Sequence, residues 1–463
     1  MAFVANTDKN RQKMLEKIGV SSFEELLKDI PTQLRLKKPL DIPSALSEPE
    51  VTRLMKSLSQ KNVSAQEYAS FLGGGSYDHF IPAAVGQLLL RSEFYTAYTP
   101  YQAEVSQGTL QAIYEFQSLI CRLTDMEVAN ASLYDGGSAL AEAAFLAFNQ
   151  TGRKWIVIPE NLHPFYRKVL KTYLGGQGFK ITEVSHTEGQ IKSADLIEKI
   201  DQNTAAVVIQ NPNFFGIVEE EIEAIEKATH AKGALLVLVC DPISLGILKT
   251  PGEYNADVVV GEGQSLGNRM SLGGPYLGFL ACKKEFARRL PGRLIGATVD
   301  SKSRRGYVMT LQTREQHIRR EKATSNICTN QGLMALAATI YLSLLGKEGI
   351  KQVAGLCLQK AHYASKQIES QTEFKLKYNS PFFREFAIEG PVSPKKVTKS
   401  GLKLKIFAGI DLGQFKIGLN QSLLMAFTEK RTKDEIDNLV TLLKSFAVQK
   451  KIPIPRAERE VRV

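Results

Sequence analysis

Four places in the sequence combine residue types that could bind a small anionic ligand or act on it. Gly136-Gly137-Ser138 precedes a predicted helix, where free backbone N–H groups can hold a phosphate. Asp241 ends an apolar run and could neutralise a cationic ring nitrogen, while His163 could stack on a flat cofactor or serve as an acid or base. In residues 319–329, four charged side chains are followed by hydroxyl and amide side chains ahead of a helix, which suits an anion.

Each of these places also has an ordinary structural interpretation. A lone Gly-Gly-Ser is more often a glycine turn with a serine cap, and an aspartate at a strand end often caps the next turn. His163 is one of six scattered histidines and fits the start of a helix. The charges of residues 319–322 fit a solvated surface equally well. The residue types alone therefore leave both interpretations open.

The elements expected to position these residues alternate along the middle of the chain. Short apolar runs of the kind that are buried on both faces are separated by segments with helical spacing. This pattern predicts an α/β fold with a mostly parallel sheet, in which ligands bind beyond the carboxyl ends of the strands. The predicted strands are Trp155 to Ile158, Ala205 to Gln210, Ala234 to Cys240, Asp257 to Val260 and Gly278 to Cys282.

Changes in pattern divide the chain into four parts. Residues 1–94 are predicted to be an N-terminal helical arm with proline-containing turns, and residues 95–331 a large α/β domain. Residues 332–448 are predicted to form a smaller C-terminal α+β domain that starts with two long helices. Residues 449–463, with two prolines and alternating charges, are expected to be an extended tail.

Composition narrows the classes of protein. The 463 residues are 43% hydrophobic and no apolar run reaches the roughly 18 residues of a membrane span, so we expect a folded protein with no membrane partner. The net charge of +11 could attract polyanions, but the basic residues are dispersed without interleaved aromatics, so nucleic acid is not expected. The five cysteines are scattered, which predicts a reducing, cytoplasmic setting and no metal site.

Three long motifs give the sequence a resemblance to a known family. They are residues 94–108, which read FYTAYTPYQAEVSQG, residues 134–138, which read YDGGS, and residues 320–329, which read REKATSNICT. In this order they resemble the P-protein family of the glycine cleavage system, and within it the alpha chains of the two-subunit form. The resemblance covers nearly the whole chain.

The resemblance implies a fold-type-I pyridoxal-phosphate (PLP) transferase-like architecture and an activity. The enzyme, a glycine dehydrogenase (aminomethyl-transferring), decarboxylates glycine and passes the aminomethyl group to the lipoyl arm of H-protein. In the family, a lysine of the beta chain holds PLP covalently, and two alpha and two beta chains form a heterotetramer. Here the corresponding slot falls at Gln264 or Ser265, and the nearest lysines are Lys249, Lys283 and Lys284. We therefore expect this chain to be inactive alone and to support a PLP site on its partner.

The resemblance also suggests roles for particular residues. Thr324, Ser325 and Asn326 would complete the phosphate cup of the partner's PLP, and Tyr95 and Tyr98 would close over the substrate and exclude water. The scaffold of a non-catalytic pseudo-site would consist of Gly136, Gly137, Ser138, His163 and Asp241. A basic face around residues 288–305 could steer an acidic H-protein.

Two other functions compete with this one. A stand-alone PLP-dependent aminotransferase or lyase would share the fold, but it needs the lysine that is missing at residues 264–265. A cofactor-free binding or scaffold protein would keep only the fold, and it would form a tight complex without changing its partner's activity.

Overall fold

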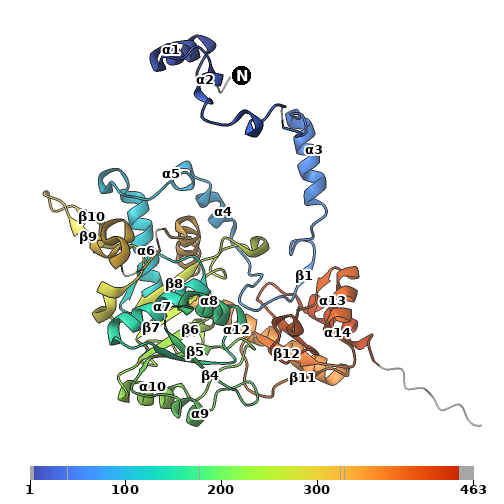
Figure 1. The fold of residues 1–463 in the computed structure, drawn as a ribbon. Coiled ribbons are helices and arrows are strands. Elements are labelled where there is room, and N and C mark those ends of the chain that lie inside the picture. The colour runs from blue at the N-terminus through green and yellow to red at the C-terminus, as the bar shows by residue number, and fades with distance from the viewer. Residues whose placement is uncertain (1–4, 39, 177, 324, 328, 448–463) are drawn as a thin grey trace, which may run out of the picture. The chain divides into compact units, whose positions relative to one another are not determined.

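The structure is a computed structural model that describes residues 5–38, 40–176, 178–323, 325–327 and 329–447. The chain divides into two compact units, residues 1–63 and residues 64–463 (Figure 1). The arm expected over residues 1–94 is thus shorter here, because residues 64–94 cluster with the second unit. The tail expected over residues 449–463 lies outside the described residues.

The first unit consists of short capped helices, as its sequence predicts. They are α1 (Asp8–Ile18), α2 (Phe23–Leu26) and α3 (Glu48–Ser59). The Ser22 side chain accepts a hydrogen bond from the Glu25 backbone N–H, and Ser47 with Glu50 forms a capping box. None of the residues described in these three helices is buried.

The second unit is built on a seven-stranded sheet with the order β2-β8-β7-β6-β5-β3-β4. The five neighbouring strands β7, β6, β5, β3 and β4 are parallel, which confirms the expected mostly parallel sheet. At one edge, β8 runs antiparallel to both of its neighbours, β7 and β2. The strands are β2 (Val128–Ala129), β3 (Trp155–Pro159), β4 (Lys180–Val184), β5 (Thr204–Asn211), β6 (Leu235–Cys240), β7 (Val258–Glu262) and β8 (Gly278–Cys282).

Both faces of this sheet are covered by helices, which explains the apolar runs. In β5, Val207 and Ile209 belong to one core, while Val208 belongs to the core on the opposite face. The first core includes α6 (Gln107–Thr124) and α10 (Ile222–Ala231), and the second includes α7 (Gly136–Thr151) and α8 (Pro164–Leu174). The smaller elements of this part of the chain are α4 (Ala83–Leu89), α5 (Ser92–Tyr95), α9 (Ser193–Ile197), α11 (Gln316–Arg319) and the hairpin of β9 (Leu294–Val299) with β10 (Arg305–Thr310).

The smaller C-terminal domain is an antiparallel sheet with helices, as predicted. Its strand order is β11-β12-β15-β14, and a short parallel pair joins β1 to β13. This pair ties residues 69–70 to the domain. The elements are β1 (Ala69–Ser70), β11 (Lys375–Leu376), β12 (Glu385–Glu389), α13 (Pro394–Lys403), β13 (Ile406–Phe407), β14 (Ile410–Asp411), β15 (Ser422–Ala426) and α14 (Lys433–Lys444).

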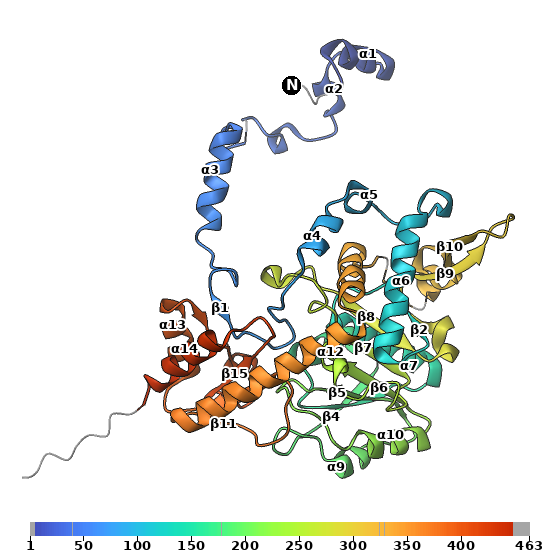
Figure 2. The same cartoon turned by 180° about the vertical axis from the view of Figure 1, so that it is seen from behind.

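Helix α12 (Gly332–Gln371) runs from the large domain into the smaller one (Figure 2). Its backbone is not helical at Gly346, where φ is 58°, so it consists of two helices, as the sequence predicts. By length and composition alone α12 could cross a membrane. Its buried residues lie in the cores of both domains, and the core helix of a folded domain meets the same criterion.

Candidate functional site

The carboxyl end of β6 places Asp241 next to a buried arginine. Arg384 Nη2 lies 2.8 Å from Asp241 Oδ2, and the Arg384 side chain is 2% exposed. The guanidinium also lies over the Tyr77 ring, at 3.6 Å from its centre, and contacts His79 Nε2. Burial disfavours the charged guanidinium, but the Asp241 carboxylate outweighs this effect and raises the pKa of Arg384. Asp241, expected to face a ring nitrogen, is thus already paired with a cation, and it also caps the next turn through Ile243 N.

The start of α7 holds a carboxylate of the same chain. Glu262, the last residue of β7, accepts a hydrogen bond from Gly136 N at 3.0 Å and from Gln264 N and Leu277 N at 2.9 Å each. Burial raises the pKa of Glu262 to about 7. The helix cap is Asp135, whose side chain accepts from Ser138 N. Two N–H groups of the predicted Gly136-Gly137-Ser138 anion site are therefore occupied by carboxylates of this chain.

His163 is the N-cap of α8, which confirms its helix-start interpretation. Its Nδ1 accepts from Phe165 N at 3.1 Å, and its Nε2 lies 2.8 Å from Gly74 O. Burial lowers the pKa of His163 to about 4, so the ring is neutral at pH 7 and Nε2 carries the proton that it donates to Gly74 O. Instead of a flat cofactor, Tyr166 stacks on this ring, with the centroids 4.6 Å apart.

At the position expected for a cofactor-binding lysine, Gln264 or Ser265, the side chain of Gln264 hydrogen-bonds to backbone atoms. Its Oε1 accepts from Tyr77 N, and its Nε2 donates to Tyr77 O and Asn268 O. Lys249 pairs with Glu223, and Lys283 pairs with Asp257.

Tyr77, His163, Asp241, Glu262 and Arg384 are among the residues that line a cavity of about 40 Å³, which has room for a few waters. Among the described residues that line this cavity there is no lysine, and PLP is far larger than its volume. The residues present do not fit bound PLP. The lining consists of Gly75, Tyr77, His163, Tyr166, Gln210, Pro212, Asn213, Phe214, Gly216, Val239, Cys240, Asp241, Pro242, Glu262, Phe383, Arg384 and Glu385.

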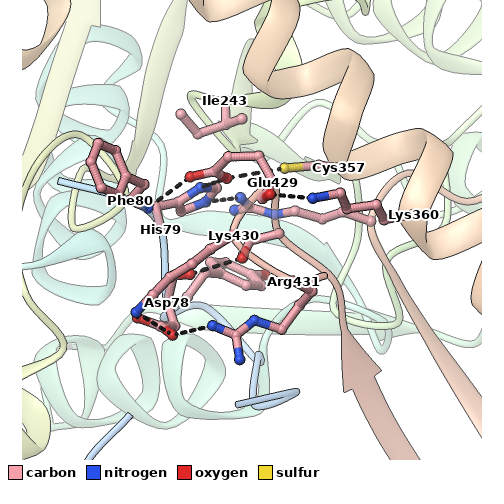
Figure 3. A network of polar contacts seen from close by, with 12 residues as sticks. Asp78, His79, Phe80, Ile243, Cys357, Lys360, Glu429, Lys430 and Arg431 are labelled. Atoms are coloured by element: carbon pink, nitrogen blue, oxygen red, sulfur yellow. Dashed lines mark hydrogen bonds and ion pairs between the residues drawn. The ribbon is translucent and has the colours of Figure 1, made fainter. Parts of the chain in front are cut away.

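The segment of residues 73–80 borders this cavity and is fixed by ion pairs (Figure 3). Asp78 accepts hydrogen bonds from Lys430 Nζ and Arg431 Nη2 at 2.9 Å. His79 Nδ1 lies 2.6 Å from Glu429 Oε2. Although burial opposes its charge, the hydrogen bond from His79 lowers the pKa of Glu429 to about 2. These contacts bind the segment to the loop between β15 and α14.

In the same network, His79, Cys357 and Glu429 have ligand atoms within 4.8 Å of one another, which is close enough to hold a metal ion. Two cations already adjoin this group, since Arg384 contacts the second ring nitrogen of His79 and Lys360 donates to the carbonyl of Glu429. The charge around the cluster therefore disfavours a metal cation, and the expectation of no metal site stays a prediction.

A second cavity, of about 270 Å³, brings together two of the sequence motifs. Tyr95 and Tyr98 line it together with Thr329 and Asn330, which lie in the segment before α12. The two tyrosines are 59% and 87% exposed, so they have little packing within the described chain. Arg293 also lines the cavity, and its guanidinium donates to Asn330 Oδ1 at 2.9 Å.

The predicted phosphate residues are not among those that line this cavity. Thr324 lies outside the described residues. Ser325 bonds to the buried Glu142 of α7 and accepts from Ile327 N, while Asn326 is exposed. The charged residues 319–322 are exposed, in agreement with their interpretation as a solvated run.

Sequence reasoning missed Arg384, which lines the first cavity. Arg384 lies 143 positions from Asp241, and no spacing in the sequence links them. Glu262 lies just beyond a predicted strand, at the edge of the sheet where ligands are expected, and this position is its signal in the sequence.

The mostly parallel sheet, with α7 starting at the carboxyl end of β7, gives the chain the fold of fold-type-I PLP-dependent enzymes. Two solved structures share this fold. A sphingosine-1-phosphate lyase of Burkholderia pseudomallei has a TM-score of 0.64 at 14% identity, covering 88% of this chain and 94% of that one. A glutamate decarboxylase of Lactobacillus brevis has a TM-score of 0.66 at 10% identity, covering 92% and 96%.

Nearer relatives narrow the class. The profile described as "Glycine cleavage system P-protein" matches residues 1–443, and the chain belongs to this family. A crystal structure of a glycine decarboxylase (P-protein) in inhibitor-bound form has a TM-score of 0.88 at 41% identity, covering 96% of this chain and 100% of that one. Two relatives are named "Probable glycine dehydrogenase (decarboxylating) subunit 1". The relative from Desulfitobacterium hafniense is 53% identical, and the match covers 95% of this chain and 98% of the relative. The relative from Chlorobium phaeobacteroides is 54% identical, and the match covers 96% of this chain and 99% of the relative.

Proposed function

We propose that this chain is subunit 1 of a glycine dehydrogenase (decarboxylating) and that it supports a PLP site carried by a separate subunit 2. The enzyme would release the carboxyl group of glycine and transfer the aminomethyl group to the lipoyl arm of H-protein, as an α2β2 heterotetramer in the cytoplasm. Both relatives are named as subunit 1 of the enzyme, which supports a partner subunit.

One observation supports the proposal that PLP is bound by the partner subunit and not by this chain. In the cofactor-type site of this chain, Glu262 occupies the helix start, Arg384 pairs with Asp241, and no described lining residue is a lysine. PLP chemistry needs a lysine that binds the cofactor. This supports a lysine and a cofactor supplied by another chain, and it argues against a stand-alone aminotransferase or lyase.

The second cavity is the best candidate for what this chain contributes. Tyr95 and Tyr98 present exposed rings beside Thr329 and Asn330, so hydroxyl and amide groups line an apolar hollow. Against a partner's active site the two rings would exclude water, and their hydroxyl groups could orient the substrate. We place Thr324, Ser325 and Asn326 near the phosphate of the partner's PLP, on the strength of the family resemblance.

Arrival of H-protein would depend on charge. Arg304 and Arg305 lie at the turn of the β9–β10 hairpin and are exposed. Exposed arginines at a protruding hairpin would attract an acidic carrier and raise its rate of association, an effect that salt screens.

The test is borohydride reduction of the full chain with PLP, alone and with subunit 2 of the same organism, followed by mass mapping of the modified lysine. We expect the label only on the partner, and exchange of the glycine carboxyl with bicarbonate only in the mixture. Stoichiometric labelling of Lys249 or Lys283 in the isolated chain would contradict the proposal. A partner that is fully active alone would favour a scaffold role instead.

A Tyr98→Ala variant tests the contribution of the second cavity. In the assembled enzyme we expect carbon dioxide release from glycine to fall by about tenfold or more, because a misplaced substrate and admitted water both slow the reaction. The PLP content should not change. Tyr98→Phe separates the hydroxyl from the ring, and Leu272→Ala, at a side chain that is 93% exposed, is the control. Unchanged kcat and KM in Tyr98→Ala would remove this residue from the site.

A further inference from the structure

The start of α7 is a ready-made anion site that already contains an anion. Three backbone N–H groups, of Gly136, Gln264 and Leu277, donate to the two oxygens of the Glu262 carboxylate at 2.9–3.0 Å. They come from three separate segments: the start of α7, the loop after β7 and the loop before β8. Such convergence on one group is the arrangement by which helix starts bind phosphate.

We propose that the Glu262 carboxylate is a built-in anion that takes the place of a cofactor phosphate and keeps this site closed with no bound group. The inference rests on the proposed function in one respect, namely that this end of α7 corresponds to the phosphate seat of the cofactor-binding relatives. The three hydrogen bonds to Glu262 are made within this chain and do not depend on a partner.

Neighbouring residues close the rest of the site in the same way. A side chain on Gly136 would place its Cβ 2.3 Å from the Tyr166 hydroxyl oxygen, so Tyr166 fills the space directly before the helix. Tyr166 also stacks on His163. Arg384 forms an ion pair with Asp241, the residue expected to face a ring nitrogen. Each position where a phosphorylated aromatic ligand would bind thus has an occupant from this chain.

The three donors are buried, whereas Glu262 itself is half-buried. Glu262 has no lysine or arginine among its hydrogen-bond partners in the described chain, and backbone N–H groups alone satisfy it. If the carboxylate is removed, three buried donors lose their acceptor, and an unmade hydrogen bond in a buried site is costly. A free anion of suitable size can then restore the lost bonds.

The experiment compares thermal unfolding of the full-length chain at pH 8 in sodium chloride and in inorganic phosphate of equal ionic strength. We expect the native chain to have the same midpoint in both salts. We expect Glu262→Ala to unfold several degrees lower in chloride and to regain part of this loss, saturably, in phosphate. Glu160→Ala is the matched control, because it removes an exposed carboxylate at the end of β3 and should show neither effect.

Two results would overturn the proposal. Phosphate could stabilise the native chain as much as the variant, which would mean that phosphate binds at the start of α7 even when Glu262 is present. Alternatively, Glu262→Ala could have the same unfolding midpoint as the native chain, in chloride and in phosphate alike. If the alanine variant does not fold, Glu262→Gln decides, since an amide has one acceptor oxygen and at least one donor must lose its partner. Unchanged amide exchange at Gly136, Gln264 and Leu277 would then refute it. None of these readouts involves subunit 2, so failure here is distinct from failure of the proposed function.

Discussion

Replacing Arg384 with methionine is expected to lower the free energy of unfolding by about 3–5 kcal/mol, the range for removing one partner of a buried ion pair. The Arg384 side chain is 2% exposed and its partner Asp241 is 14% exposed. Methionine keeps much of the volume beneath the Tyr77 ring but leaves the Asp241 carboxylate without its cation. Urea unfolding of the purified chain, followed by circular dichroism, measures the loss.

Two further variants distinguish the ion pair from simple packing. In Arg384→Met/Asp241→Asn no unpaired charge remains, so we expect at least half of the lost stability to return. Arg304→Met removes the cation of an exposed pair with Asp300, where the side chains are 74% and 38% exposed, and should cost less than about 1 kcal/mol. A double variant as unstable as the sum of its single variants would mean that Arg384 acts through packing alone.

The large sheet could be predicted from sequence because its central strands are buried on both faces. Residues of β5, β6 and β7 alternate between two cores, so almost every position is apolar and the runs stand out. The strand β4 was missed, since it lies at the edge of the sheet and its residues Lys180–Val184 are mostly half-exposed and partly polar. The β9–β10 hairpin was missed for a similar reason, because the second half of β9 is exposed and most of β10 is only half-buried.

The site was predictable only where one segment carries its whole geometry. The side chains of His163 and Ser138 hydrogen-bond to backbone atoms of the helix start in which each residue lies. Their positions in the sequence therefore predicted a helix start for both. The ion pair of Asp241 with Arg384 joins two domains, and the bonds between Gln264 and Tyr77 join residues 187 positions apart. Contacts of this kind depend on the tertiary fold and leave no periodic signal in the sequence. Consequently the sequence indicated which elements border the cavity but not which side chains fill it.

The segment of residues 73–80 has no regular secondary structure, so its position depends on side-chain contacts (Figure 3). Replacing Asp78 with asparagine is therefore expected to lower the free energy of unfolding by about 2–3 kcal/mol, because Arg431 is 2% exposed and would keep only Glu435, at 3.4 Å, as an ion partner. The value lies below that for Arg384 because this second carboxylate remains. Urea unfolding measures it.

Local amide exchange gives the same Asp78→Asn variant a sharper readout than global stability. If the ion pairs hold the segment, exchange of residues 73–80 should rise more than exchange of β5 or β6, since local opening no longer breaks a buried pair. Glu223→Gln, which removes an exposed pair with Lys249, is the matched control and should change neither quantity measurably. Equal increases in all segments would show that Asp78 supports the whole domain, not the segment. Because Tyr77 and Gly75 border the cavity, a selective increase would also identify this segment as the movable wall of the closed cofactor-type site.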